Sequence, residues 1–397
     1  MIHFYKPVTL GEKLDMMSAR LMNEIDLNDI HQVNALKLSL SRIVDTVNAN
    51  VKSIFQKYIQ DEVFWQKISN TSIELCPGMS EEEKKLYNTI IQRSKDDCND
   101  KIDLLQLRLN IVLEKANMIQ SSQTNNLKLL DIMEIVTKNC TDDITKINKK
   151  ESETTCYRKL AKILDELLEG TNLDMLDGEI TCEATKIIAK EQAKIFSNTI
   201  RLSRSFGRRI DLILSAKEIE LSANEWKKEK TVITQSLKQQ NKNLRVNKAI
   251  LTHVEKLPLE NEIFIIGMDW TGFMGYMFGL KHLEDIYIAK HISNLIIPKY
   301  SCQISSFIET LDRLYSWKNS LIMLKNIVLN ATLKHEESEF FARVGTTPAP
   351  TQAKSLSPNI YLTPHRKKAV YSNIDEDIYD EDVYDEDDYN DNEHDIF

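Results

Sequence analysis

Residues that end helices are scarce in this chain, and this scarcity constrains its fold more than any other feature. The chain has 10 glycines and 8 prolines among 397 residues, and no proline lies between Pro77 and Pro258. β sandwiches and barrels need many tight turns built from these two residue types, whereas long helices exclude proline. The sequence therefore predicts a mainly α-helical fold, an elongated helical bundle or coiled coil.

The strongest helical pattern lies between residues 102 and 147. Mostly apolar positions recur there at alternating steps of three and four residues, which is typical of helices that wind around one another. Gln123 and Asn126 interrupt this seam, and they either fix the register of a coiled coil or mark a break between two helices. A similar spacing recurs over 233–254. The positions of the first seam are Ile102, Leu105, Leu109, Val112, Ala116, Ile119, Leu130, Met133, Thr137, Cys140, Ile144 and Ile147.

The positions of the prolines and changes in composition divide the chain into five regions. Ser80 with Glu83 three residues later has the form of a capping box, which predicts that a helix begins there. The expected regions are an N-terminal helical segment (1–75), a long helical coiled-coil region (80–257), an apolar glycine-containing insertion (258–300), a C-terminal helix (301–338), and a disordered linker with an acidic tail (339–397).

The apolar insertion differs from the rest of the chain because four of the ten glycines fall within 263–280. This segment is expected to form a compact α/β insertion, a β-hairpin tip or a buried glycine-rich helix. Its aromatic residues also suggest a membrane-active helical protein. Asp269 inside the segment and Lys281 just after it make contact with a membrane unlikely, and favour core packing or a protein interface.

Negative charge is concentrated at the C-terminal end. The net charge of the chain is −9, but 371–397 alone holds thirteen Asp and Glu residues and no Lys or Arg, which leaves 51 basic against 47 acidic residues elsewhere. Tyrosines at five-residue intervals and a terminal Phe accompany these carboxylates, so we expect the tail to dock on a basic groove of a partner. The proposed docking residues are Tyr379, Tyr384, Tyr389, Ile396 and Phe397.

Two short motifs precede this tail. Ser357 and Thr363 are each followed by proline, which is the form of a proline-directed phosphorylation site. Phosphate on Thr363 would add negative charge beside the basic residues Arg366 and Lys367, and would weaken their hold on other anions. We therefore expect a phosphoprotein.

Basic residues dominate a stretch before the insertion. Over 201–256 there are thirteen basic and six acidic residues, and the arginines at its start fall on or near one expected helical face. Such a basic strip either contacts the phosphates of a nucleic acid or is the solvated face of a coiled coil. The arginines proposed to contact a polyanion are Arg201, Arg204, Arg208 and Arg209.

Motifs that carry catalysis or bind cofactors are not found. The sequence has no phosphate-binding or dinucleotide-binding glycine loop and no zinc-protease or serine-hydrolase motif, and its histidines and six cysteines form no metal-ligand spacing. No catalytic residue, cofactor or metal is therefore expected. Six cysteines without pairing motifs, no secretory leader and no long apolar run indicate an intracellular protein of the cytoplasm or nucleus.

These observations favour a non-enzymatic scaffold protein. It would assemble with itself or with other helical proteins through its heptad seams, and use its acidic, tyrosine-rich tail for partner docking or regulation. The alternatives are a nucleic-acid-associated factor that uses 201–256, with the acidic tail as its electrostatic regulator, and a membrane-active protein that uses 263–280.

Overall fold

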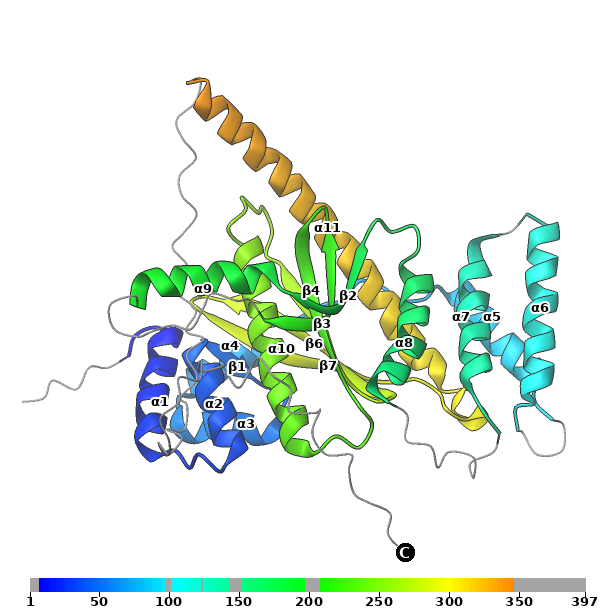
Figure 1. Ribbon diagram of the computed structural model, residues 1–397, viewed down its shortest axis with the longest axis horizontal. Coiled ribbons are helices and arrows are strands. Elements are labelled where there is room, and N and C mark those ends of the chain that lie inside the picture. The colour runs from blue at the N-terminus through cyan, green and yellow to red at the C-terminus, as the bar shows by residue number, and fades with distance from the viewer. Residues whose placement is uncertain (1–6, 97–100, 123, 143–151, 197–207, 346–397) are drawn as a thin grey trace, which may run out of the picture.

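A mixed β-sheet forms the centre of the molecule (Figure 1). The computed structural model describes residues 7–96, 101–122, 124–142, 152–196 and 208–345. The described strands form a seven-stranded sheet in the order β1-β7-β6-β5-β4-β3-β2. Their bounds are β1 (Ile43–Asp45), β2 (Asp174–Thr181), β3 (Arg209–Ala216), β4 (Ile219–Lys227), β5 (Phe264–Thr271), β6 (Met274–Leu283) and β7 (Ile286–Ile296). The predicted helical bundle or coiled coil is therefore wrong.

The sheet consists mainly of antiparallel neighbours. β2, β3 and β4 form one antiparallel meander, and β5, β6 and β7 form another. Lys217 and Glu218 have positive φ angles of 47° and 68° in the β3–β4 turn, as tight hairpins require. β4 pairs in parallel with β5, and β1 in parallel with β7. A parallel pair needs a crossover connection, which α10 provides between β4 and β5.

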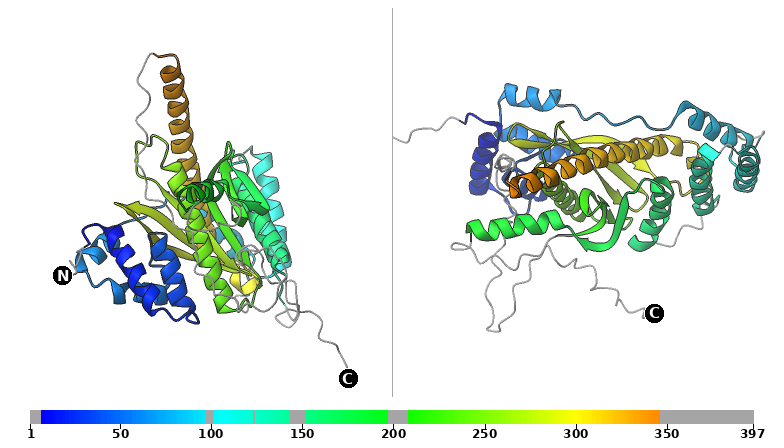
Figure 2. Two further views of the ribbon diagram at one scale, coloured as in Figure 1. Left: turned by 60° about the vertical axis from the view of Figure 1, so that its left-hand side comes forward. Right: turned by 90° about the horizontal axis from the view of Figure 1, so that it is seen from above.

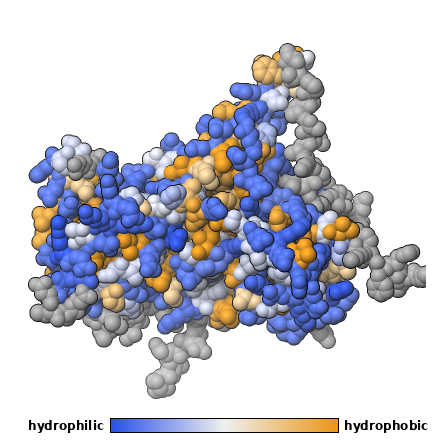
Figure 3. Space-filling model, turned by 180° about the vertical axis from the view of Figure 1, so that it is seen from behind, coloured by the Kyte–Doolittle hydropathy of each residue, from blue (hydrophilic) through white to orange (hydrophobic). Residues whose placement is uncertain are grey.

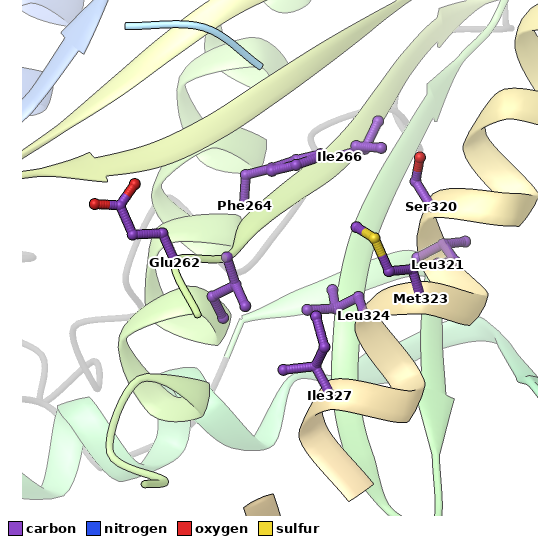
Figure 4. A pocket seen from close by; sticks show the side chains of 9 residues that line it. Glu262, Phe264, Ile266, Ser320, Leu321, Met323, Leu324 and Ile327 are labelled. Atoms are coloured by element: carbon purple, nitrogen blue, oxygen red, sulfur yellow. The ribbon is translucent and has the colours of Figure 1, made fainter. Parts of the chain in front are cut away.

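Helices cover both faces of the sheet (Figure 2). α10 packs on one face against β4 and β5, while α8 and α11 contact the sheet from the other face. Phe264 and Ile266 of β5 line a small pocket with Leu321 and Leu324 of α11 (Figure 4). The helices are α1 (Leu10–Glu24), α2 (Ile30–Leu40), α3 (Ala49–Tyr58), α4 (Glu62–Asn70), α5 (Glu81–Arg93), α6 (Leu104–Gln120), α7 (Leu127–Asn139), α8 (Glu153–Leu168), α9 (Glu183–Phe196), α10 (Ile233–Val254) and α11 (Phe307–Arg343).

The predicted seam over 102–147 is not a coiled coil. α6 ends at Ser121 and α7 begins after a short 3₁₀ turn at Thr124–Asn126, so the polar interruption is the break between two helices. Ser122 has a φ of 58°, which a chain reversal permits and a continuous helix does not. α6 and α7 contact each other as neighbouring helices. The last seam positions, 144 and 147, lie outside the described residues.

The second seam belongs to α10, which is a helix as the spacing predicts. Its seam residues Leu244, Leu251 and Val254 are buried, but against the sheet and its neighbouring elements. Polar residues on the other sides of α10 are also buried. A helix enclosed on most sides by one fold cannot be the exposed seam of a coiled coil.

The apolar insertion forms part of the sheet. Residues 264–296 make β5, β6 and β7, so the β-hairpin alternative comes closest. Trp270, Met277 and Phe278 are buried. An added Cβ at Gly267 would lie 2.5 Å from the ring of Phe278, so this glycine permits close packing across the hairpin.

One local prediction is confirmed. Ser80 and Glu83 form both hydrogen bonds of the capping box at the start of α5, at 2.7 and 3.2 Å. The helix expected over 301–338 corresponds to α11 with other bounds: α11 begins at Phe307 and continues to Arg343, so 339–343 are helical and not part of a disordered linker. The part of the tail beyond residue 345 lies outside the described residues.

Asn247 connects α10 to the backbone of β4. Its side-chain amide accepts a hydrogen bond from the N–H of Ala223 and donates one to the carbonyl of the same residue, both at 2.9 Å. β4 and β5 begin their direct pairing only at Glu225. The side-chain amide of Asn247 therefore takes the place of β5 as the hydrogen-bond partner of the buried N–H and carbonyl of Ala223.

We predict that Asn247→Ala lowers the free energy of unfolding by about 2–4 kcal/mol, because it leaves the buried N–H and carbonyl of Ala223 unpaired. Chemical denaturation measures this loss. Lys238→Ala, at an exposed position of the same helix, serves as the control and changes it by less than about 0.5 kcal/mol. Equal effects of the two substitutions would contradict the bridging role of Asn247.

Candidate active site at the ends of β4 and β5

Three acidic residues lie in a row across adjacent strands of the sheet. Glu225 of β4 pairs with Asp269 of β5. The recorded pairing of β3 with β4 ends at Leu212 and Asn224, and Asp211 of β3 lies just beyond it, close enough for its charge to act on both Glu225 and Asp269. Directly paired residues share one face of a sheet with Cβ atoms about 5 Å apart. Glu225 and Asp269 therefore share the face that α10 covers, and together with the neighbouring Asp211 they are called the carboxylate row.

Strand direction explains why the three carboxylates lie at the same end of their strands. Glu225 and Asp269 are both near the carboxyl ends of two parallel strands, which meet at the same edge. Asp211 is near the beginning of the antiparallel strand β3, which places it at that edge too. Its Oδ2 accepts a hydrogen bond of 2.7 Å from the N–H of Trp226. Carboxyl ends of parallel strands are a common position for ligand sites in α/β folds.

Asp269 is held by three side-chain donors. Its Oδ1 accepts hydrogen bonds from Asn243 at 2.9 Å and Gln239 at 3.3 Å, and its Oδ2 accepts one from Tyr276 at 2.7 Å. Burial raises the pKa of Asp269 to about 6, although these three hydrogen bonds favour the ionised form. This carboxylate is fixed in position by α10 and β6.

Glu225 is the most enclosed member of the row, with 1% of its surface exposed. Burial raises its pKa to about 8, and the charges of Asp211 and Asp269 act in the same direction. Lys242 of α10 opposes this effect, because its Nζ lies 3.0 Å from Oε1 of Glu225. The two groups form a buried contact that favours the ionised form of Glu225.

Asp45, at the end of β1, adds a further buried carboxylate. Its Oδ1 accepts hydrogen bonds from the N–H groups of Val47 and Asn48, whereas its Oδ2 has no hydrogen-bond partner. Burial raises the pKa of Asp45 to about 7, and the charge of Asp269 contributes in the same direction. Buried acids with raised pKa values gathered in one region mark a candidate functional site.

Lys227 lies two residues after Glu225 on β4 and pairs with Thr271 of β5. Residues two apart on a strand point to the same face, so the side chain of Lys227 starts on the same face as that of Glu225. Lys227 is half-buried. A cation is thus placed beside the acidic row at the edge of the sheet.

The donor set suits a hard divalent cation bound partly by water. Among residues 7–96, 101–122, 124–142, 152–196 and 208–345, no three His, Cys, Asp or Glu side chains converge as a metal site. Mg²⁺, however, is commonly held by one or two carboxylates, with water in its remaining positions. Asp211 and Glu225, whose charges act on each other, are the two candidate ligands.

The basic strip over 201–256 does not form one continuous element in the structure. Arg201 and Arg204 lie outside the described residues. Arg208 precedes β3 and Arg209 begins it, so these two residues lie at a strand and the expected helical face is wrong for them. Arg245 of α10 is buried, so the strip is not one continuous solvated face.

The remaining predicted site residues cannot be placed. Ser357 and Thr363, and the proposed docking residues of the tail, fall outside the described residues. The sequence interpretation missed the carboxylate row entirely. Its local signal was an acidic residue followed two positions later by Lys at the end of an apolar, β-branched stretch, Glu225 and Lys227.

Comparison with known protein families, with curated proteins and with solved structures finds no match to this chain. In the part of the chain that the structure describes, no helix combines the length and the apolar content that crossing a membrane requires. The function is therefore argued from the site alone.

We predict that Asp45→Asn reduces the pH dependence of stability. The folded-state pKa is raised above 3.8 to about 7, so the stabilising contribution of the protonated carboxyl is fully present below pH 4 and is lost as the pH rises to 7. Relative to the wild type, the variant should gain about 3 kcal/mol in the free energy of unfolding between pH 4 and pH 8. Chemical denaturation at both pH values measures this change, and a constant difference would contradict it.

Proposed function

We propose that the protein is a divalent-metal-dependent phosphodiesterase that cleaves nucleic acid. The observation that carries this proposal is the carboxylate row of Asp211, Glu225 and Asp269, with Lys227 beside it at the edge of the sheet. The proposal replaces the expectation of a non-enzymatic protein, which rested on the absence of local motifs. A site assembled from separate strands leaves only a weak local motif.

Each residue of the site has a role in this reaction. Asp211 and Glu225 would hold Mg²⁺, and Asp269 is fixed by its hydrogen bonds beside them. The bound ion supplies Lewis-acid stabilisation of charge on the phosphate and a more acidic water. Lys227 stabilises the negative charge that develops on the phosphoryl oxygens when water attacks phosphorus and the bond to the leaving sugar oxygen breaks. The attacking water gives up a proton to solvent, and the leaving sugar oxygen takes one up.

The distribution of positive charge favours a polyanionic substrate. Arg209 lies two residues before Asp211, and Lys227 two residues after Glu225. Lys228 and Lys230 are exposed in the connection that follows β4, and Lys238 is exposed on α10. Arg209 and these lysines belong to the basic strip over 201–256. In the sequence they lie near Asp211 and Glu225. Contacts of this kind bind phosphates without reading the base sequence. Such a substrate suits a protein of the cytoplasm or nucleus.

Purified protein incubated with end-labelled single-stranded and duplex DNA and RNA tests the proposal. We expect cleavage of at least one substrate with Mg²⁺ or Mn²⁺ and none with a chelator. Asp211→Asn and Glu225→Gln should each lower the rate at least about 100-fold. Glu218→Gln, at the opposite end of the same β3–β4 hairpin, is the matched control and should keep full activity.

Two results would contradict this function. One is the absence of cleavage of all four substrates with both metals. The other is cleavage by Asp211→Asn and Glu225→Gln at the wild-type rate, which would trace the activity to a contaminant or to another site.

Self-association is a second candidate function, and exposed residues of α6 favour it. Five large apolar residues of this helix, four of them positions of the predicted seam over 102–147, face solvent at the end of the molecule on the left in Figure 3. A stripe of apolar residues at this spacing suits packing against a second helix. The exposed residues are Leu105 (74%), Leu109 (50%), Val112 (52%), Leu113 (52%) and Ile119 (62%).

If the α6 stripe mediates self-association, the double substitution Leu109→Glu and Val112→Glu should weaken dimer formation at least about tenfold, because it sets charges in an apolar interface. Sedimentation over a range of protein concentrations measures this equilibrium. Asn117→Glu, at an exposed polar position of α6, is the control and should leave it unchanged. A wild-type protein that stays monomeric at every concentration would exclude this function for the stripe.

A further inference from the structure

Cations from separate parts of the chain gather around the turn between β5 and β6. Lys159 of α8 and Lys299, which follows β7, both hold Nζ over the ring of Phe273 in this turn, at 5.0 and 4.6 Å from its centroid. The N–H of Gly272 in the same turn donates to the carbonyl of Lys227 at 2.8 Å, so the turn lies beside the end of β4. Positive charge from α8, β4 and the segment after β7 therefore meets at one end of the sheet.

The connection that follows β4 joins these elements. The N–H of Lys228 donates to Oε2 of Glu153 at the start of α8, at 3.2 Å. Nζ of Lys299 lies 2.5 Å from Oε2 of Glu229. Lys228 and Lys230, on either side of Glu229 in the chain, are exposed. The two glutamates of these segments are thus engaged by a backbone N–H and by Lys299, and the side chains of Lys228 and Lys230 stay available to an anion.

The first half of α8 extends this positive charge over the surface. Arg158 and Lys162 are four residues apart, which places them on the same side of the helix, and both are exposed. The other side of α8 is buried through Leu160 and Leu164. Within the described ranges, neither Arg158 nor Lys162 forms an ion pair. Asp165 follows them on the exposed side and marks the end of the basic stretch.

We infer that a nucleic-acid duplex binds across the β5–β6 turn and along α8 through its phosphate backbone. This inference rests on the proposed function for the identity of the substrate, and it adds the form of that substrate and the surface that holds it. Cations that contact phosphates position a duplex without reading its base sequence. The residues of this basic surface are Arg158, Lys159, Lys162, Lys228, Lys230 and Lys299.

The aromatic ring at the centre of the basic surface favours a duplex over a single strand. Surfaces that bind single strands present aromatic rings on which bases stack. Phe273 is 5% exposed and lies beneath the ammonium groups of Lys159 and Lys299, so a base cannot stack on it. The exposed groups of the surface are cations, and a duplex carries about twice the phosphate charge of one strand along its axis.

Fluorescence anisotropy of a short labelled duplex, measured with the full-length protein and a chelator over a range of salt concentrations, tests this inference. The double substitution Arg158→Ala and Lys162→Ala should weaken binding at least about tenfold. It should also lower the slope of log Kd against log salt concentration by about 2, because each phosphate contact contributes about 0.9 to this slope. Lys228→Ala with Lys230→Ala should have an effect of the same size.

Arg20→Ala with Lys85→Ala is the matched control. It removes one arginine and one lysine from exposed positions of α1 and α5, and so changes the net charge by the same amount. Binding and salt slope should stay at the wild-type values, which separates a local surface from the effect of net charge. The substituted positions are exposed, so each variant should keep the wild-type melting temperature within a few degrees.

The outcomes separate this inference from the proposed function. If the Arg158 and Lys162 variant keeps the wild-type affinity and salt slope, or if a single strand binds more tightly than the duplex, the inference is overturned. Cleavage with Mg²⁺ or Mn²⁺ then still supports the proposed function. If the duplex binds with the expected dependence on these residues but is never cleaved, the proposed function falls and the basic surface stands.

Discussion

The arrangement of the site depends on the parallel pairing of β4 with β5. This pairing sets Glu225 beside Asp269 in the interior of the protein. This parallel pairing is possible because α10 connects the end of β4 to the start of β5. Side-chain amides of α10 also bond to the backbone of these strands where the two strands do not bond to each other. Asn247 pairs with the backbone of Ala223, and Asn243 donates to the carbonyl of Met268 and to Asp269. The polar residues of α10 thus maintain both the sheet and the position of the acidic row.

Buried carboxylates are costly, and this fold keeps several near one another. Burial raises the pKa values of Asp45, Glu225 and Asp269. Apolar residues of similar size in such positions are often neutral or stabilising. Acidic residues that lower stability but occupy one edge of a sheet point to a functional need for their charge. The divalent ion of the proposed function would relieve the repulsion among them and so couple stability to that chemistry.

Helical periodicity was informative about local structure and misleading about assembly. The seam over 102–147 does correspond to helices, but α6 and α7 form a hairpin, and the seam residues of α6 face solvent. The spacing in α10 reflects burial beneath other elements of the same chain. An apolar stripe shows that one face of a helix is suited to packing, and does not specify whether the same chain covers that face. The strands β5 to β7 were missed as a sheet, although aromatic and β-branched residues are frequent there.

The sequence by itself determined those features that depend only on residues close together in the chain. Ser80 and Glu83 specify the start of α5 through hydrogen bonds that span three residues, and the composition separates the acidic tail from a slightly basic body. Only the tertiary structure decided the site. Asp45, Glu225 and Asp269 are far apart in the chain, and their approach depends on which strands pair and in what register. Those choices come from the packing of the whole sheet against α10, because no short segment contains the partners that it will contact.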